Sequence, residues 1–271
     1  MSQAVADLKD QHAATPQRVI QPADAEMPAL KYGQRLRLGM VVPSVNSNAE
    51  AHIAAMLPDG VTLHTTRLRM DERDSNAMLG FIDHIEDAAS LLKDAGCQHI
   101  LVNCTAVTTA DPTIGARISD RIKAATGLPS STTGDGVVAA LKALRARKVV
   151  MLTPYRRAVN EREARYLEHH GFQVLDWEGL ELNGAQEFDE VTPDRWRQLV
   201  NAHRNNDTDA YFVSCAQVRV VEVIAPLERD LARPVITSNQ AATWWALRQC
   251  GIAVFTRKHG LLGNFRWGRC R

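Results

Sequence analysis

The sequence has few cysteines, no long apolar run and no excess of charge of one sign, and each lack excludes a class of protein. Its five cysteines form no CxxC pair and no regular spacing, which argues against a disulfide framework or a zinc site and favours reduced thiols in the cytoplasm. No run approaches the roughly 20 apolar residues that span a bilayer. The 32 basic and 31 acidic residues leave a net charge of +1, so no overall field attracts nucleic acid. We therefore expect a cytoplasmic globular protein without a membrane or nucleic-acid partner.

Signatures of metal and nucleotide enzymes are also missing. There is no P-loop lysine motif, no GxSxG elbow and no HExxH sequence. The stretch GDGVVA at 134–139 matches GxGxxA, but the strand expected after it ends in Thr153 and Pro154 instead of the acidic residue that would hold a ribose. We expect neither a metal nor a cofactor.

Apolar strands alternate with helices once the chain has passed its first residues. Residues 1–34 show no sustained periodicity, and we interpret them as a mobile arm or one that orders on another subunit. The run at 35–43 suits a strand buried on both faces, and further patterns predict a strand at 61–68 and one helix over 78–96. This alternation predicts βαβ units and a parallel sheet.

The second half of the chain repeats the first. KVVMLTPY echoes RLGMVVPS, and AYFVSCAQV echoes HILVNCTAV, so that Pro43 and Pro154 lie 111 residues apart, as do Cys104 and Cys215. We predict an α/β fold of two Rossmann-like lobes with parallel sheets, related by pseudo-twofold symmetry, with the active site in the cleft between them. The expected domains are the arm at 1–34, one lobe of 35–129 plus 237–271, and a second lobe of 130–236.

The doubled architecture gives the two repeated cysteines a special place. In open parallel sheets, ligands bind at the carboxyl ends of the strands, where Cys104 and Cys215 both lie. If the lobes face each other, the two thiols approach a bound small molecule from opposite sides. The alternative is that each cysteine is only a small buried apolar residue.

Several stretches together resemble one known superfamily. VVPSVNSNAE, NCTAV, SSTTGDGVVAALKALRARKVVMLTPY and SCAQVRVVEVIAPLERDLARPVITSNQAATWWAL are similar to the aspartate/glutamate racemase superfamily, in its branch of maleate cis-trans isomerases and arylmalonate decarboxylases, over about residues 36–252. The resemblance implies a cofactor-independent enzyme with its site between two lobes. In maleate isomerases one thiolate adds to the double bond and the other donates a proton. In racemases the thiols are opposed base and acid, and the decarboxylases keep only the second cysteine.

Both cysteines are present here, which favours an isomerase or racemase of a small carboxylic acid. Cys104 would be the nucleophile or base and Cys215 the acid. Thr105 and the SNQA turn at 238–241 look more like the decarboxylases, so decarboxylation of a substituted malonate stays an alternative. A third possibility is a protein that binds a small acid without changing it.

Negative charge that develops on the substrate must be held by directed donors. We expect these from the strand ends, where helix N-termini would also lower the pKa of the thiols. For Asn46 the alternative is a role only as a helix cap, and the two roles are compatible. The basic stretch at 256–271 resembles a nucleic-acid segment, but the neutral chain favours contact with a partner subunit, and we expect a homo-oligomer. The expected substrate-binding residues are Ser44, Asn46, Thr105, Ala106, Tyr155, Ala216, Ser238 and Asn239.

Overall fold

The computed structural model describes residues 32–71, 77–252 and 259–264. The chain divides into two units, residues 1–30 and 31–271, and all of the described residues lie in the second. The arm predicted at 1–34 therefore lies outside the described residues except for its last three. The same holds for the basic stretch at 256–271, apart from residues 259–264.

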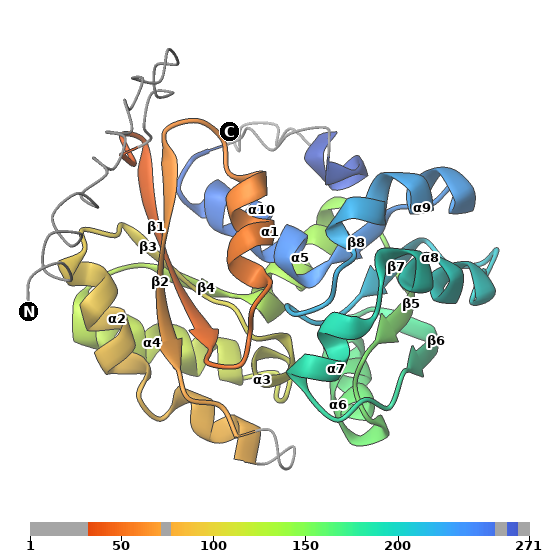
Figure 1. Cartoon of the computed structure of the whole chain (residues 1–271), viewed down its shortest axis with the longest axis horizontal. Helices are drawn as coiled ribbons and strands as arrows, with labels where there is room; N and C mark the ends of the chain where they lie inside the picture. The colour runs from red at the N-terminus through yellow and green to blue at the C-terminus, as the bar shows by residue number, and fades with distance from the viewer. Residues whose placement is uncertain (1–31, 72–76, 253–258, 265–271) are drawn as a thin grey trace, which may run out of the picture. The chain divides into compact units, whose positions relative to one another are not determined.

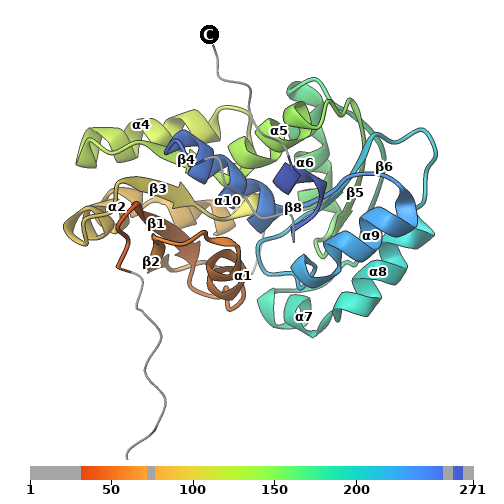
Figure 2. The same ribbon diagram turned by 90° about the horizontal axis from the view of Figure 1, so that it is seen from above.

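The first half of the chain forms a parallel sheet of four strands in the order β2-β1-β3-β4 (Figure 1). Its central strand β1 is buried from Leu38 to Pro43, which explains the continuous apolar run in the sequence. Helices α1 and α10 contact one another near this sheet, and α2 packs on α4 (Figure 2). The elements are β1 (Leu36–Pro43), α1 (Ala49–Met56), β2 (Val61–Leu68), α2 (Ile85–Asp94), β3 (His99–Val102), α3 (Thr105–Thr108), α4 (Ile114–Thr126) and β4 (Ser130–Thr132).

The second half repeats this plan. Its parallel sheet has the order β6-β5-β7-β8, in which each strand takes the place of its counterpart in the first sheet. The prediction of an α/β fold with two parallel sheets is confirmed. The elements are β5 (Lys148–Thr153), α6 (Arg157–His169), β6 (Gln173–Gly179), α7 (Ala185–Glu190), α8 (Pro193–Ala202), β7 (Ala210–Val213), the 3-10 helix η2 (Val221–Val223), α9 (Ile224–Leu231) and β8 (Val235–Thr237).

Helices α5 (Thr133–Ala143) and α10 (Ser238–Gln249) join the two halves. Each follows the last strand of its sheet and begins with a capping box, made by Thr132 with Asp135 and by Thr237 with Gln240. The two helices pack against each other, and α10 also contacts α1, β3 and β4 of the first sheet. The first sheet includes β4 at 130–132, three residues beyond the predicted lobe boundary, and the division of the chain into lobes stays a prediction.

The glycines of the GDGVVA stretch have a packing role. A Cβ at Gly136 would lie 2.7 Å from Ala242 Cα and 2.9 Å from Ala241 O, and one at Gly134 would lie 2.7 Å from Thr108 O. These glycines allow α5 to approach neighbouring backbone. The match to a dinucleotide motif is therefore explained by helix packing.

This close approach gives a testable consequence. A Gly136→Ala variant is expected to lose about 1–3 kcal/mol of unfolding free energy, because the new methyl group meets backbone that cannot move aside cheaply. Urea unfolding would measure the loss. Gly80→Ala is the matched control, since its Cβ would meet nothing closer than Asp83 Oδ2 at 3.6 Å. Equal stabilities of the two variants would contradict the packing argument.

The helix predicted over 78–96 is interrupted. A 3-10 helix, η1 (Ala77–Ile82), is followed by a turn and then by α2. Phe81 and Ile82 before the turn and Ile85 after it are all buried in the same apolar cluster. A last short 3-10 helix, η4, spans Leu261–Asn264.

None of the helices within the described part of the chain is long and apolar enough to cross a membrane.

Candidate active site

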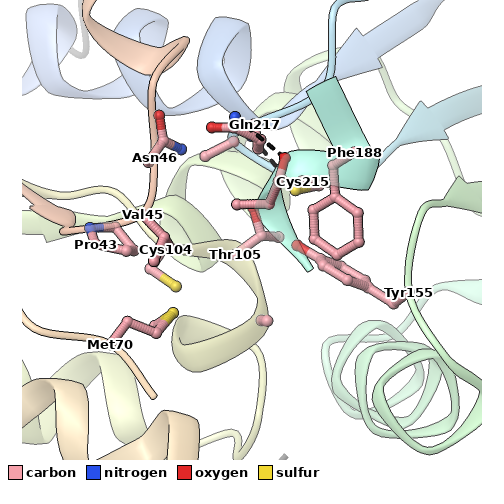
Figure 3. A pocket seen from close by; sticks show the side chains of 13 residues that line it. Pro43, Val45, Asn46, Met70, Cys104, Thr105, Tyr155, Phe188, Cys215 and Gln217 are labelled. Carbon is pink, nitrogen blue, oxygen red and sulfur yellow. Dashed lines mark hydrogen bonds between the residues drawn. The ribbon is translucent and has the colours of Figure 1, made fainter. Parts of the chain in front are cut away.

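A pocket with about 370 Å³ of empty space lies where strands from both sheets end (Figure 3). Both Cys104 and Cys215 line it, and each is only 6 % exposed. Figure 3 shows Cys104 on the side of Pro43, Val45 and Met70, and Cys215 on the side of Tyr155 and Phe188. The lining residues are Pro43, Val45, Asn46, Met70, Cys104, Thr105, Ala106, Tyr155, Ala185, Phe188, Cys215, Ala216 and Gln217.

Cys104 lies just beyond β3 and directly precedes α3. Its backbone is extended, at φ −149° and ψ 105°, and its carbonyl accepts hydrogen bonds from the amide and the hydroxyl of Thr108. On the preceding side, the Asn103 amide donates to the Val41 carbonyl at 2.8 Å, so the backbone is fixed on both sides of this thiol. The apolar strand before it and the hydroxyl residues after it are the sequence pattern that pointed to this position.

Cys215 follows β7 in a strained backbone conformation. Its φ of 98° is rare for a residue with a side chain, and such strain is typical of functional sites. The Cys215 amide donates to Ser238 Oγ at 3.0 Å, and the Gln217 amide donates to Cys215 Sγ at 3.3 Å. These bonds hold the sulfur at the pocket wall.

Burial raises the pKa of the Cys215 thiol to about 12, although hydrogen bonds from the Tyr155 hydroxyl and the Gln217 amide act in the opposite direction. The expectation that a helix N-terminus lowers this pKa is wrong for Cys215, because a turn follows it and the next helical element is η2. The thiol is therefore protonated at neutral pH. That state suits a proton donor.

Tyr155 lies two residues after β5, at the position that mirrors Ser44 in the repeat. Its ring contacts Phe188 edge-on, with 5.8 Å between the ring centroids. Burial raises the pKa of its hydroxyl well above the usual value, and the nearby Cys215, Glu163 and Cys104 raise it further. The hydroxyl therefore stays protonated and can donate to Cys215 or to a ligand.

Three of the predicted binding residues do not line the pocket. Ser238 and Asn239 are buried one layer behind it, at the start of α10. Ser44 is exposed, and its hydroxyl accepts a hydrogen bond from the Met70 amide at 3.2 Å. Ser238 and Asn239 support the loops after β3 and β7, and their predicted contact with substrate stays a prediction that this placement does not favour.

The support from α10 reaches both cysteine loops. Ser238 Oγ accepts from Thr105 Oγ1 at 2.8 Å as well as from the Cys215 amide. Asn239 donates to the Ala216 carbonyl at 2.9 Å and accepts from Asn103 Nδ2 at 2.9 Å. A pair of adjacent side chains thus ties the two cysteine-bearing loops together. Thr105 and Ala216 nevertheless line the pocket, as does Ala106.

Asn46 caps a helix and also lines the pocket. Its Oδ1 accepts hydrogen bonds from the amides of Asn48 at 3.1 Å and Ala49 at 2.9 Å, which satisfies donors at the start of α1. Its side chain also lines the pocket. Among the described residues no partner occurs for its Nδ2, which is therefore available to donate to a ligand.

Sequence reasoning missed a contact that joins the loop after β1 to the loop after β7. Gln217 Oε1 accepts from the Ser47 amide at 2.9 Å, and its Nε2 donates to Ser47 Oγ at 2.8 Å. Beside it, Asn48 Nδ2 donates to Asp189 Oδ1 at 2.7 Å and to the Gln217 carbonyl at 2.6 Å. The only sequence signal for this contact between the loops is the position of Gln217, two residues after Cys215.

The pocket wall is uncharged. None of its described lining residues carries a charged side chain, and within the described ranges no group of three or more His, Cys, Asp or Glu residues could hold a metal ion. A carboxylate in this pocket would be held by amide, hydroxyl and backbone donors. Apolar side chains of Val45, Met70 and Phe188 leave room for a hydrocarbon part of the ligand.

The fold and this pocket define a two-lobed α/β protein with a thiol on each wall of one cavity. The family model of arylmalonate decarboxylase matches residues 38–262, and the chain belongs to that family. This confirms the predicted branch of maleate isomerases and arylmalonate decarboxylases.

Maleate isomerases and an arylmalonate decarboxylase are similar to this chain over most of their length. A maleate isomerase from Nocardia farcinica is 29 % identical over 230 residues, covering 80 % of this chain and 91 % of that protein. An arylmalonate decarboxylase from Bordetella bronchiseptica is 27 % identical over 217 residues, covering 79 % and 90 %. The prediction of an enzyme of the isomerase type agrees with these relatives, among which several are maleate isomerases.

Solved structures match the fold. A cysteine-to-serine variant of the Nocardia farcinica maleate cis-trans isomerase, with a covalently bound succinylcysteine intermediate, superposes with a TM-score of 0.77 at 25 % identity and covers 85 % of this chain and 99 % of its own. A crystal structure of arylmalonate decarboxylase superposes with a TM-score of 0.74 at 27 % identity and covers 84 % and 99 %.

Proposed function

We propose that this enzyme isomerises a small unsaturated dicarboxylate, with maleate as the first substrate to test, by the combined action of Cys104 and Cys215. The observation that carries the proposal is the presence of both thiols on the wall of one pocket. Support also comes from the maleate isomerase relatives and from the covalent succinylcysteine recorded in one of them.

The chemistry assigns one step to each thiol. Cys104, as the thiolate, adds its sulfur to one carbon of the double bond, and the electron pair moves toward the adjacent carboxylate. Cys215 gives its proton to the neighbouring carbon, which leaves a succinyl thioether and the Cys215 thiolate. Rotation about the new single bond follows. Cys215 then takes a proton back from that carbon, the carbon–sulfur bond breaks, and the trans product leaves with the Cys104 thiolate and the Cys215 thiol restored.

The protonated state of Cys215 supports its role as the proton donor in these reaction steps. A thiol whose pKa burial raises to about 12 holds its proton until a strongly basic carbon develops beside it. Hydrogen bonds from Tyr155 and Gln217 stabilise the thiolate that forms after transfer. Asn46 and the backbone amides after Cys104 are proposed to hold a substrate carboxylate. Thr105, Ala106, Tyr155 and Ala216 complete the proposed binding wall.

The direct test is conversion of maleate to fumarate, followed by proton NMR in deuterated water. We expect fumarate to accumulate with no added metal or cofactor. Deuterium at the α-carbon of an amino acid, without fumarate from maleate, would instead indicate a racemase. No change in any small carboxylate, with binding retained, would favour a protein that only binds acids.

A second candidate function is decarboxylation of a substituted malonate. The observation in its favour is the apolar part of the wall, made by Val45, Met70 and Phe188, which could accept an aryl or alkyl group. Release of carbon dioxide from phenylmalonate, with no isomerisation of maleate, would establish it.

We further propose that the enzyme acts in the cytoplasm as a homo-oligomer. The proposed chemistry needs reduced thiols, and no disulfide joins the cysteines at 97, 104, 215 and 250 within the described part of the chain. Light scattering on the purified protein measures the number of subunits.

A further inference from the structure

A carboxyl group lies buried behind Cys215 and takes no part in the proposed reaction. Glu163, on the inner face of α6, is 0 % exposed. The Ser214 hydroxyl lies 2.7 Å from one of its carboxyl oxygens and 2.9 Å from the other. Ser214 is the residue directly before Cys215. No ion pair to Glu163 occurs within the described part of the chain.

A protonated carboxyl fits the geometry of this pair. A serine hydroxyl has one hydrogen, which it donates to one oxygen or shares between the two. The second short contact is satisfied when the carboxyl carries a proton and donates it back to Ser214 Oγ. Burial without a cation acts in the same direction and raises the pKa of Glu163 to about 8, against the effect of the Ser214 hydrogen bond.

The pair also holds one side of the strained turn. Ser214 is fixed through its amide, which donates to the Leu152 carbonyl at 2.8 Å, and through its hydroxyl, which contacts Glu163. The Cys215 amide is fixed by Ser238 Oγ, and on the other side the Ala216 carbonyl accepts from Asn239 Nδ2 at 2.9 Å. Cys215 can keep its φ of 98° because both neighbours are anchored.

We propose that Glu163 is a positioning residue that is protonated in the active enzyme, where it anchors Ser214 and leaves Cys215 able to release its proton, and that its ionisation weakens Cys215 as an acid. The proposal rests on the proposed function in assigning Cys215 the role of acid. A negative charge behind the thiol opposes formation of a second negative charge on Cys215 sulfur. Ionisation of Glu163 therefore slows the proton-donating step.

The other titratable groups that interact with Glu163 do not replace it in this role. Glu163 raises the pKa values of Tyr155, Tyr166 and Cys215, which burial already holds high, so all three stay protonated near pH 8. Asp135 acts on Tyr166, farther from the thiol. Glu163 is the group of this cluster that titrates close to neutral pH.

The first test follows Cys215 itself and needs no substrate. The rate of iodoacetamide alkylation at Cys215, measured by peptide mass spectrometry, is compared between the wild type and Glu163→Gln, in which the amide accepts from Ser214 and donates back as the protonated acid does. We expect equal rates at pH 6.5 and a rate about tenfold higher in the variant at pH 9.5, the effect of one pKa unit on the thiolate fraction. Equal rates at both pH values, or the same ratio at both, would overturn the proposal.

Glu161→Gln is the matched control, because Glu161 lies on the same helix but pairs with Arg157 at the surface, at 2.7 Å. It should alkylate like the wild type throughout. In turnover, kcat of the wild type should fall as the pH rises through about 8, and this decline should be absent from Glu163→Gln with KM unchanged. If no turnover is found at all, the alkylation result still decides the role of Glu163.

Stability gives a third readout of the proton on Glu163. Because its pKa is about 8 in the folded protein and 4.5 in the reference state, the folded protein binds the proton more tightly, and this contribution is complete below pH 4.5 and lost as the pH rises through about 8. The urea midpoint of Glu161→Gln should fall more over this window than that of Glu163→Gln. Parallel midpoints would show that Glu163 is already ionised.

Discussion

A Cys104→Ala variant is expected to lose isomerase turnover by at least about 10⁴-fold, because the methyl group cannot add to a double bond and no second nucleophile replaces it. The fold should be unchanged, since the replaced sulfur lies at the wall of a pocket that already has space. Conversion of maleate to fumarate, followed by NMR, measures the loss.

The same variant separates the two candidate reactions. Decarboxylation needs only Cys215, so carbon dioxide release that survives in Cys104→Ala would identify a decarboxylase. Cys97→Ala is the control in the same half of the chain. Cys97 is buried in the cluster beneath the first sheet and does not line the pocket, so turnover should stay at the wild-type level. Isomerisation by Cys104→Ala at the wild-type rate would refute the assigned nucleophile.

A Cys215→Ala variant is expected to lower kcat by about 10²–10⁴-fold, the usual contribution of a positioned general acid. Because Cys104 remains, addition to the double bond is still possible, and the variant should accumulate a covalent adduct or return the cis substrate unchanged. Intact-protein mass spectrometry after mixing with maleate detects such an adduct, and NMR measures kcat.

Cys250→Ala serves as the control for Cys215. Cys250 ends α10, is half-buried and lies outside the pocket, although burial raises the pKa of this thiol to about 11. It shares the raised pKa of Cys215 but not its position, so its loss should leave kcat unchanged. Comparable loss in both variants would point to a general effect of thiol removal and against a role for Cys215 in catalysis.

The pattern of apolar residues along the chain was enough to predict its architecture. An apolar run buried on both faces of a sheet has to be continuous, which is why β1 could be recognised from residues 35–43. The repeat of Pro43 and Cys104 at Pro154 and Cys215 indicated two copies of one unit, and the strand orders of the two sheets agree with it. The interrupted helix at 77–94 could not be foreseen, because the turn depends on where Phe81 and Ile85 find burial.

The pocket was less predictable than the strands that carry it. Residues within three positions of a strand end, such as Asn46 and Tyr155, were found because chain direction alone places them at the edge of the sheet. Met70 and Phe188 were missed, since one reaches the cavity from the segment after β2 and the other from the short helix α7, and the placement of both depends on packing. Ser238 and Asn239 were predicted to line the pocket but are buried behind its wall, because a sequence does not show how far a side chain lies from a cavity.

The sequence by itself determined the two parallel sheets, their duplication and the position of a thiol at the end of one strand in each, because strand burial and strand direction are local properties of the chain. The tertiary structure decided which side chains line a cavity with those thiols and which side chains only support the loops. It also decided how burial changes the pKa values of the thiol and carboxyl groups. Those properties depend on distances between segments far apart in sequence and on the exclusion of water, and both arise only when the two halves pack together.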